Sequence, residues 1–163
     1  RAQAFGMKIC YYNRRRLDLE TEEKLGVSYC SLEELLEISD VVSLNVPLTK
    51  ETYHLIGKQQ LDRMKPTAFI VNTARGAVID EPVLIKYLQE GRLAGAGLDV
   101  YENEPKIPDE LLKMDRVVLT PHIGTASQEA RIQMAQAASR NIIDYFEGKA
   151  LQYIVNPRVL NLS

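Results

Sequence analysis

The sequence is poor in the residues that build metal centres and disulfide frameworks. It contains only two cysteines and two histidines among 163 residues. Cys10 and Cys30 stand apart, without the spacing of a metal or redox motif, so we interpret them as reduced thiols and predict no metal site. Because reduced thiols are typical of a cytosol-like compartment, we also predict a cytoplasmic location.

Long apolar runs and an excess of one charge are missing as well. The apolar runs are far shorter than a bilayer span, which argues against a membrane protein. Twenty Lys and Arg against 22 Asp and Glu give a formal net charge of −2. That balance gives no signal for nucleic acid or for a membrane surface. The hydrophobic share of 45% is that of an ordinary globular domain with a core.

What the chain does contain is an alternation of strand-like apolar runs and amphipathic helical stretches. Strands that alternate with helices imply right-handed crossovers and a parallel sheet that is covered on both faces. The expected fold is therefore α/β, with a doubly wound parallel sheet. Strands are predicted at residues 7–12, 41–46, 68–74, 94–100 and 117–120, and helices at residues 32–39, 58–64, 81–91 and 125–147.

Capping signals mark the starts of three of these helices. Ser31 with Glu34, and Thr125 with Gln128, have the spacing of capping boxes. Asp80 has the side chain and the position of an N-cap for the helix at residues 81–91. These signals agree with the alternation of elements and support the predicted helix starts.

Ionic and polar residues follow the predicted strands. In an open parallel sheet, ligands bind beyond the carboxyl ends of the strands, so these residues are the first candidates for a site. Five strand ends contribute to this predicted edge. Their residues are Asn13 with Arg14, Arg15 and Arg16; Val46 and Pro47; Thr73 and Arg75; Asp99 and Glu104; and His122 and Gly124.

Each candidate also has a structural interpretation. Arg75 can form a structural salt bridge, and a lone histidine such as His122 is often structural. Residues 14–16 can form a solvated basic turn, which is the commoner role of a charge run. Asp99 can cap or turn the chain, and residues 102–104 can be a solvated acidic loop. Because all of these candidates follow predicted strands, we favour a role in a ligand site over these structural interpretations.

Taken together, these residues resemble the D-isomer-specific 2-hydroxyacid dehydrogenases. The matching stretches cover nearly the whole chain in the right order and with spacing that agrees. The combination of an arginine loop, an acidic loop and a Pro-His-Ile-Gly loop is specific. The stretches are "SDVVSLNVPLTKETYHLIG", "MKPTAFIVNTARGAVID", "GRLAGAGLDVYENEP" and "VVLTPHIGTAS".

The resemblance implies a role for three residues in hydride transfer. Arg75 binds the substrate carboxylate and polarises the reacting carbonyl. His122 is the general acid in reduction and the base in the reverse direction. Glu104 orients His122 and raises its pKa. Formate dehydrogenases of the superfamily have Gln at this position, so Glu104 argues against that branch.

The resemblance also implies a set of cofactor contacts. Asp99 binds the nicotinamide carboxamide, and Val46 and Pro47 line the adenine and ribose side. Ile123 and Gly124 close over the nicotinamide ribose. The predicted cofactor-binding set is Asn13, Arg14, Arg15, Val46, Pro47, Thr73, Ala74, Arg75, Asp99, His122, Ile123 and Gly124.

The turn at residues 13–15 bears on the choice of cofactor. NAD users of dinucleotide folds place an Asp or Glu after the second strand to bind the ribose 2′-hydroxyl. This chain has Asn13 there, followed by arginines that can bind a 2′-phosphate. We therefore predict NADPH, with NADH as the alternative. The pattern is similar to glyoxylate and hydroxypyruvate reductases, so the predicted substrate is a small 2-oxoacid, reduced to the D-2-hydroxyacid.

The resemblance further predicts that the chain is a fragment. Residues 1–5 read as a helix end closed by Gly6, and the family's glycine-rich phosphate loop and most of its substrate domain are expected outside the sequence. Residues 1–150 are then a partial dinucleotide-binding domain, an incomplete Rossmann-type fold. Residues 151–163 are expected to return into the substrate domain. Family members are usually homodimers, and we expect one here, with no nucleic-acid or membrane partner.

Two other hypotheses compete with the reductase. One is an NAD(H)-sensing interaction protein of the transcriptional corepressor type, which keeps this fold and much of the catalytic triad. The other is an inactive truncated product. Turnover of glyoxylate distinguishes the reductase from the corepressor-type protein. Cooperative folding of the chain tests the hypothesis of an inactive truncated product.

Overall fold

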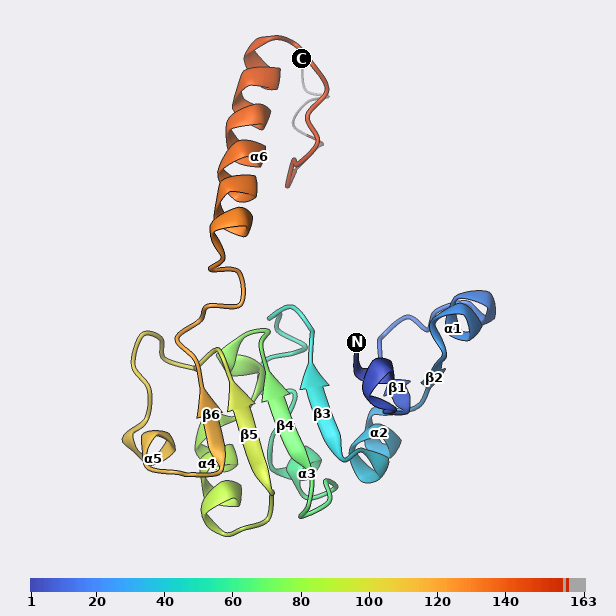
Figure 1. The fold of residues 1–163 in the computed structure, drawn as a ribbon, viewed down its shortest axis with the longest axis vertical. Helices are drawn as coiled ribbons and strands as arrows, with labels where there is room; N and C mark the ends of the chain where they lie inside the picture. Colours follow the sequence, from blue (N-terminus) through green and yellow to red (C-terminus); the bar gives the residue numbers. More distant parts are fainter. Residues whose placement is uncertain (157, 159–163) are drawn as a thin grey trace. The chain divides into compact units, whose positions relative to one another are not determined.

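The computed structural model describes residues 1–156 and 158 of the chain (Figure 1). The chain divides into two compact units, Arg1–Pro121 and His122–Ser163. Within the described residues, no helix has the length and apolarity needed to cross a membrane.

A four-stranded parallel sheet forms the centre of the first unit. Its strand order is β3-β4-β5-β6, which follows the order along the chain. The pairing places Leu44, Asn72, Leu98 and Leu119 in one row at the carboxyl ends. The predicted α/β fold with a parallel sheet is confirmed. The strands are β3 (Val41–Leu44), β4 (Phe69–Asn72), β5 (Gly95–Leu98) and β6 (Val117–Leu119).

Short helices connect these strands, and two of the predicted N-caps are observed. Ser31 Oγ accepts a hydrogen bond from the Glu34 N–H at 3.1 Å. Asp80 Oδ1 accepts one from the Val83 N–H at 3.3 Å. Both bonds satisfy a donor that the first helical turn leaves free. The helices are α2 (Leu32–Ile38), α3 (Lys58–Leu61), α4 (Glu81–Gln89) and α5 (Asp109–Leu112).

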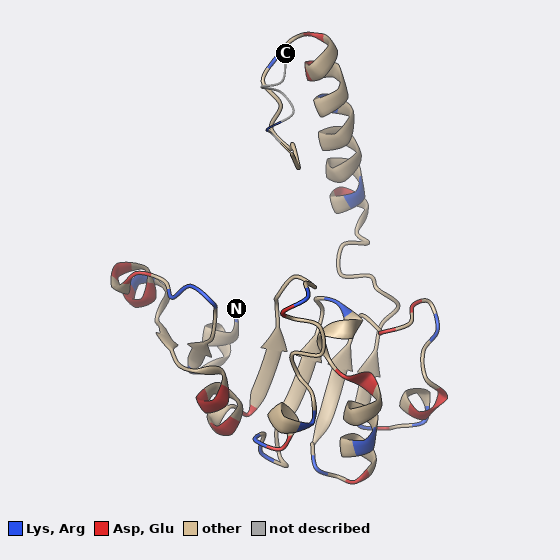
Figure 2. Ribbon diagram, turned by 180° about the vertical axis from the view of Figure 1, so that it is seen from behind, with Lys and Arg blue, Asp and Glu red and all other residues tan. Residues whose placement is uncertain are grey.

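The hydrophobic core lies on one face of this sheet, where α3 and α4 pack (Figures 1 and 2). Ile70 of β4 is fully buried there. The opposite face exposes Val41, Phe69 and Val118, whose side chains are 40%, 47% and 70% accessible. The sheet is therefore flanked by helices as expected. The sequence predicts helices over both faces of the sheet, but the three side chains named above are exposed on the second face.

The first strand pairs differently from the prediction. β1 (Ile9–Tyr11) forms a separate two-stranded parallel sheet with β2 (Val27–Tyr29). The sequence reasoning missed β2 and also α1 (Leu19–Leu25), which joins the two strands. The expected helical end at the N-terminus is present as the 3₁₀ helix η1 (Ala2–Phe5), closed by Gly6 at φ 75°.

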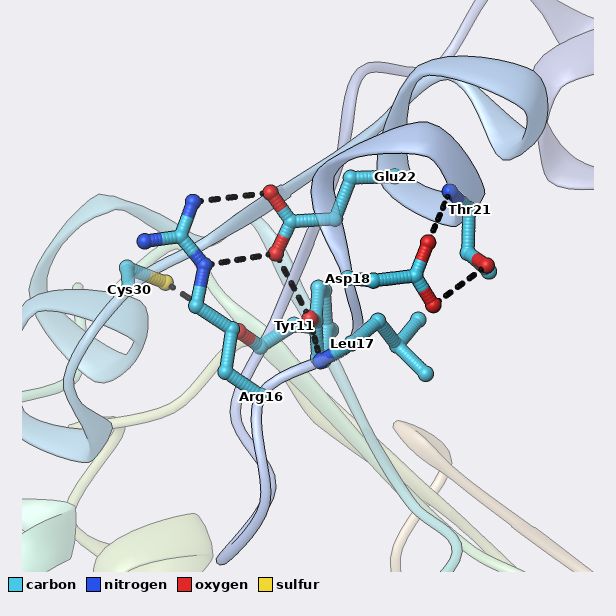
Figure 3. Close-up of polar contacts among 7 residues, drawn as sticks. All are labelled: Tyr11, Arg16, Leu17, Asp18, Thr21, Glu22 and Cys30. Carbon is cyan, nitrogen blue, oxygen red and sulfur yellow. Dashed lines mark hydrogen bonds and ion pairs between the residues drawn. The ribbon is translucent and has the colours of Figure 1, made fainter.

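Polar contacts hold the region around β1 and β2 together (Figure 3). Arg16 forms a two-pronged ion pair with Glu22, with both N···O distances 2.8 Å. The Tyr11 hydroxyl donates to the same carboxylate at 2.8 Å and accepts from the Leu17 N–H. These bonds lower the pKa of Glu22 to about 2, with the Arg16 hydrogen bonds as the largest cause. Arg16 is therefore a structural residue.

The second unit contains one long helix, α6 (Gln128–Phe146). Its N-cap is Ser127, whose Oγ accepts from the Ala130 N–H at 3.1 Å, so the cap predicted at Thr125 is wrong by two residues. Within the helix, Asn141 Nδ2 donates at 2.8 Å to the carbonyl of Tyr153, which follows the helix. The predicted return segment, residues 151–163, forms no strand in its described part, and the rest of it lies outside the described residues.

Candidate active site

An open groove of about 610 Å³ lies beyond the carboxyl ends of β3 and β4. Five of the predicted site residues line it together. The lining consists of Asn45, Val46, Pro47, Leu48, Thr73, Ala74 and Arg75. The structure therefore brings these predicted residues to one edge of the sheet, where parallel sheets bind ligands.

Arg75 lies exposed on the loop that leaves β4. Its Nη1 donates to the Ala74 carbonyl at 2.6 Å, and its backbone is extended (φ −148°, ψ 141°). An exposed guanidinium on a groove offers a planar set of donors that matches a carboxylate. The groove thus combines apolar side chains with one fixed positive charge.

Asn72 holds the Arg75 loop in place, and the sequence reasoning missed it. The residue is 1% exposed at the end of β4. Its Nδ2 donates to the Arg75 carbonyl at 2.9 Å, and its Oδ1 accepts from the Ala74 N–H at 3.1 Å. A buried amide needs such partners, so a polar residue that closes an apolar strand was the available signal.

Gly76 fixes the same loop from the other side. It opens the 3₁₀ helix η2 (Gly76–Val78). A Cβ at this position would lie 1.9 Å from the Tyr101 carbonyl carbon and 2.4 Å from the Glu102 nitrogen. No side chain fits there, so the backbone after Arg75 packs directly on the backbone after β5.

Asp99 follows β5 and is 6% exposed. Its carboxylate accepts from the Thr120 hydroxyl at 2.5 Å, and its N–H donates to the Asn72 carbonyl at 3.0 Å. These bonds join the ends of β4, β5 and β6 at one point. Asp99 therefore has a structural function at this edge, and the nicotinamide contact stays a prediction.

The acidic loop after β5 is more structured than a solvated charge run. Glu104 is exposed, and its Oε1 accepts from the Tyr101 N–H at 3.0 Å. Glu102 Oε1 lies 2.8 Å from Nε2 of His54. The Glu102 N–H donates to the buried Glu81 carboxylate at 3.2 Å, and burial raises the pKa of Glu81.

The remaining predicted residues lie outside this groove. Asn13, Arg14 and Arg15 are exposed on the turn between β1 and α1, which Figure 2 colours blue over its basic part. His122, with φ 53°, opens the second unit, followed by Ile123 and Gly124. Among the described residues, no three His, Cys, Asp or Glu side chains gather as a metal site would require.

The fold and the groove define the class of the protein. A parallel sheet whose carboxyl ends carry a groove is the arrangement of a dinucleotide-binding α/β domain. Residues 1–124 match the family described as D-isomer specific 2-hydroxyacid dehydrogenase, NAD binding domain. The chain belongs to this family.

Relatives and solved structures agree with that assignment. The glyoxylate reductase of Thermococcus litoralis is 53% identical over 163 residues, which cover all of this chain and 49% of that protein. The crystal structure of a glyoxylate reductase from Paecilomyes thermophila has a TM-score of 0.87 and 46% identity, over 95% of this chain and 47% of that one.

A third similarity is to an NADPH-dependent glyoxylate/hydroxypyruvate reductase from Sinorhizobium meliloti, solved with NADP and malonate. It has a TM-score of 0.87 and 35% identity, over 94% of this chain and 47% of that one. The chain thus spans about half the length of the curated relatives that it matches. These relatives are named as reductases, so the corepressor hypothesis is not favoured.

Proposed function

We propose that the protein reduces a small 2-oxoacid, glyoxylate or hydroxypyruvate, to the D-2-hydroxyacid with NADPH. The observation that carries the proposal is the groove beyond β3 and β4 with Arg75 on its wall. Similarity to proteins named glyoxylate reductase supports the reaction class. The nicotinamide cofactor, when bound, supplies the hydride that the carbonyl carbon receives.

In this proposal Arg75 binds the substrate. Its guanidinium donates two parallel hydrogen bonds to the carboxylate of the 2-oxoacid and polarises the neighbouring carbonyl. Asn72 and Gly76 act through Arg75, because they fix the backbone on either side of it. Thr73, Ala74, Val46 and Pro47 shape the wall of the groove that faces the cofactor.

His122 and Glu104 form the proposed acid–base pair. The imidazolium of His122 gives a proton to the carbonyl oxygen during reduction and takes it back in the reverse direction. Glu104 accepts a hydrogen bond from the other ring nitrogen and thereby orients the imidazole. Asp99, Ile123 and Gly124 complete the proposed contacts to the nicotinamide side.

NADPH is the proposed cofactor because of the turn at residues 13–15. Arg14 and Arg15 are exposed there, while Arg16 is paired with Glu22. Two arginines without an adjacent acidic residue in the turn suit a 2′-phosphate. The similar structure from Sinorhizobium meliloti is named as NADPH-dependent, which supports this choice. NADH is the alternative.

We also propose a homodimer in the cytoplasm. The free thiols of Cys10 and Cys30 support a reducing compartment. The exposed apolar side chains of α6, among them Met134, Ile142 and Phe146, support association. Sedimentation equilibrium of the protein at its full natural length measures the oligomeric state.

One experiment tests the reaction and the cofactor together. NADPH and NADH are titrated into the protein at its full natural length, and binding is followed by fluorescence. Turnover of glyoxylate and of hydroxypyruvate is assayed in the same sample. We expect tighter binding of NADPH and turnover that depends on glyoxylate. The matched control is His122→Ala, which should bind NADPH as before and lose turnover by about 10²–10⁴-fold, the usual contribution of a general acid. Cofactor binding by the unmodified protein, without turnover of either glyoxylate or hydroxypyruvate, would refute the reductase.

A further inference from the structure

His54 connects two segments of the candidate site that lie far apart in the sequence. Its backbone N–H donates to the Ala77 carbonyl at 2.8 Å. Two residues later, the Ile56 N–H donates to the Val78 carbonyl at 3.1 Å. Through these bonds, the chain at residues 54–56 runs alongside the segment that follows Arg75.

The side chain of His54 reaches the other segment. Nε2 lies 2.8 Å from Glu102 Oε1, and the carboxylate accepts from the ring nitrogen. Nδ1 lies 3.9 Å from Asp80 Oδ2 on the opposite side of the ring. The ring stacks on Tyr53 with centroids 4.0 Å apart, and the Tyr53 hydroxyl lies 3.4 Å from the same Glu102 oxygen.

The surroundings leave the imidazole little freedom. The His54 side chain is 29% exposed and that of Glu102 is 18% exposed. The backbone of His54 is left-handed, with φ 50°, a conformation that residues other than glycine adopt only when their contacts hold them there. The ring is therefore fixed at a defined place between the two segments.

Glu102 in turn belongs to the backbone that packs on Gly76. The Glu102 N–H is bound to Glu81 at 3.2 Å, and the Tyr101 N–H is bound to Glu104 at 3.0 Å. A displacement of Glu102 would thus move the Glu104 loop relative to the Arg75 loop. The contact of His54 with Glu102 joins these two loops through side chains.

We propose that His54, acting through Glu102, is a positioning residue that sets the place of the Glu104 loop relative to Arg75. The inference rests on the proposed function, because it concerns the geometry of that site. His54 does not line the groove, so it acts without touching the substrate. A small misplacement of reacting groups lowers the rate steeply, so the effect should appear in kcat.

The test compares four variants of the protein at its full natural length. His54→Ala removes the contact, His54→Gln keeps a donor, and Glu102→Gln weakens the contact from the other side. Arg63→Ala is the matched control, since it removes an ion pair with Glu37 on the surface between α2 and α3. The measurements are kcat, KM, NADPH affinity, thermal stability and amide exchange at Tyr101 and Glu102.

We expect His54→Ala to lower kcat about tenfold, with NADPH affinity changed less than twofold. His54→Gln should recover most of kcat, Glu102→Gln should fall between them, and Arg63→Ala should match the unmodified protein. Amide exchange at Tyr101 and Glu102 should speed up in His54→Ala. A kcat of His54→Ala within twofold of that of the unmodified protein would overturn the inference. The same holds if His54→Gln loses as much kcat as His54→Ala while its stability is normal.

The exchange measurement separates this inference from the proposed function. If the unmodified protein reduces neither glyoxylate nor hydroxypyruvate, the proposed function fails. Faster exchange at Tyr101 and Glu102 in His54→Ala would still support the connection between the two loops. Unchanged exchange in both His54→Ala and Glu102→Gln would overturn it, whatever the activity.

Discussion

The four-stranded sheet β3–β6 and the two-stranded sheet β1–β2 carry different parts of the candidate site, and different forces hold them. The first sheet packs its strands on α3 and α4 over a core of fully buried side chains such as Ile70, Leu61 and Leu84. In the described part of the chain, this core contains no residue that precedes Leu32. Around β1 and β2, hydrogen bonds join Arg16 and Tyr11 to Glu22 (Figure 3), and the Tyr29 ring packs against Tyr11 and Arg16.

The difference predicts unequal local stability within one unit. Apolar burial is the larger stabilising term, and in the described residues that precede Ser31 the only buried apolar side chain is Cys30. The proposed substrate side with Arg75 is therefore built on the more stable sheet. The turn with Arg14 and Arg15, which we propose to select the cofactor, is built on the less stable one.

The largest effect is expected from a cavity in the four-stranded sheet. Ile70→Ala should lower the free energy of unfolding by about 2–5 kcal/mol, because it removes a fully buried side chain. Val118→Ala is the matched control, since Val118 is 70% exposed on β6 and should change stability by less than about 0.5 kcal/mol. Urea denaturation measures both. Equal losses in the two variants would contradict the described core.

A smaller effect is expected from the basic turn. Replacing Arg14 and Arg15 together with Ala should shift the preference from NADPH toward NADH by about 1–3 kcal/mol, the scale of lost charge-assisted hydrogen bonds. The ratio of the two dissociation constants measures the shift. Arg16→Ala is the control. Because Arg16 is engaged by Glu22, it should loosen β1–β2 and leave the ratio nearly unchanged. An unaltered ratio in the double variant would refute the 2′-phosphate role.

The smallest effect is expected from acid titration of Glu22. Its pKa is about 2 in the folded state and about 4.3 in unfolded chains. Its stabilising contribution is present above about pH 4 and is lost as the pH falls toward 2. Amide protection factors of β1 and β2 should therefore decline over this range before those of β4. In Glu22→Gln, the protection factors of β1 and β2 should be lower already at pH 6 and should not decline further as the pH falls from 4 to 2. A simultaneous decline in both sheets would remove the distinction between them.

The two sheets also differ in how well the sequence predicts them. Apolar runs and the caps at Ser31 and Asp80 predict the elements around the buried sheet, because burial imposes the pattern that sequence reasoning detects. The polar α1 and β2 lack such a pattern. The Asp18 N-cap, bound to Thr21 at 2.8 Å, and the Gly26 C-cap at φ 61° were the signals that could have revealed α1.

The candidate site divides in the same way. Val46, Pro47, Thr73, Ala74 and Arg75 were predictable because residues after parallel strands meet at one edge. The contacts of Gly76 and His54 involve the backbone and side chains of residues 101–102, which are distant in sequence. Local patterns carry no information about such contacts, so these supporting residues emerge only from the fold.

The tight contact at Gly76 has a consequence for anyone who wishes to redesign the groove. Any substitution at position 76 would push the loop apart before it could reshape the groove, so a mutational library should leave this codon untouched. Leu48 is exposed and lines the groove, and it carries no such constraint. Diversity placed at Leu48 reshapes the groove on an intact scaffold.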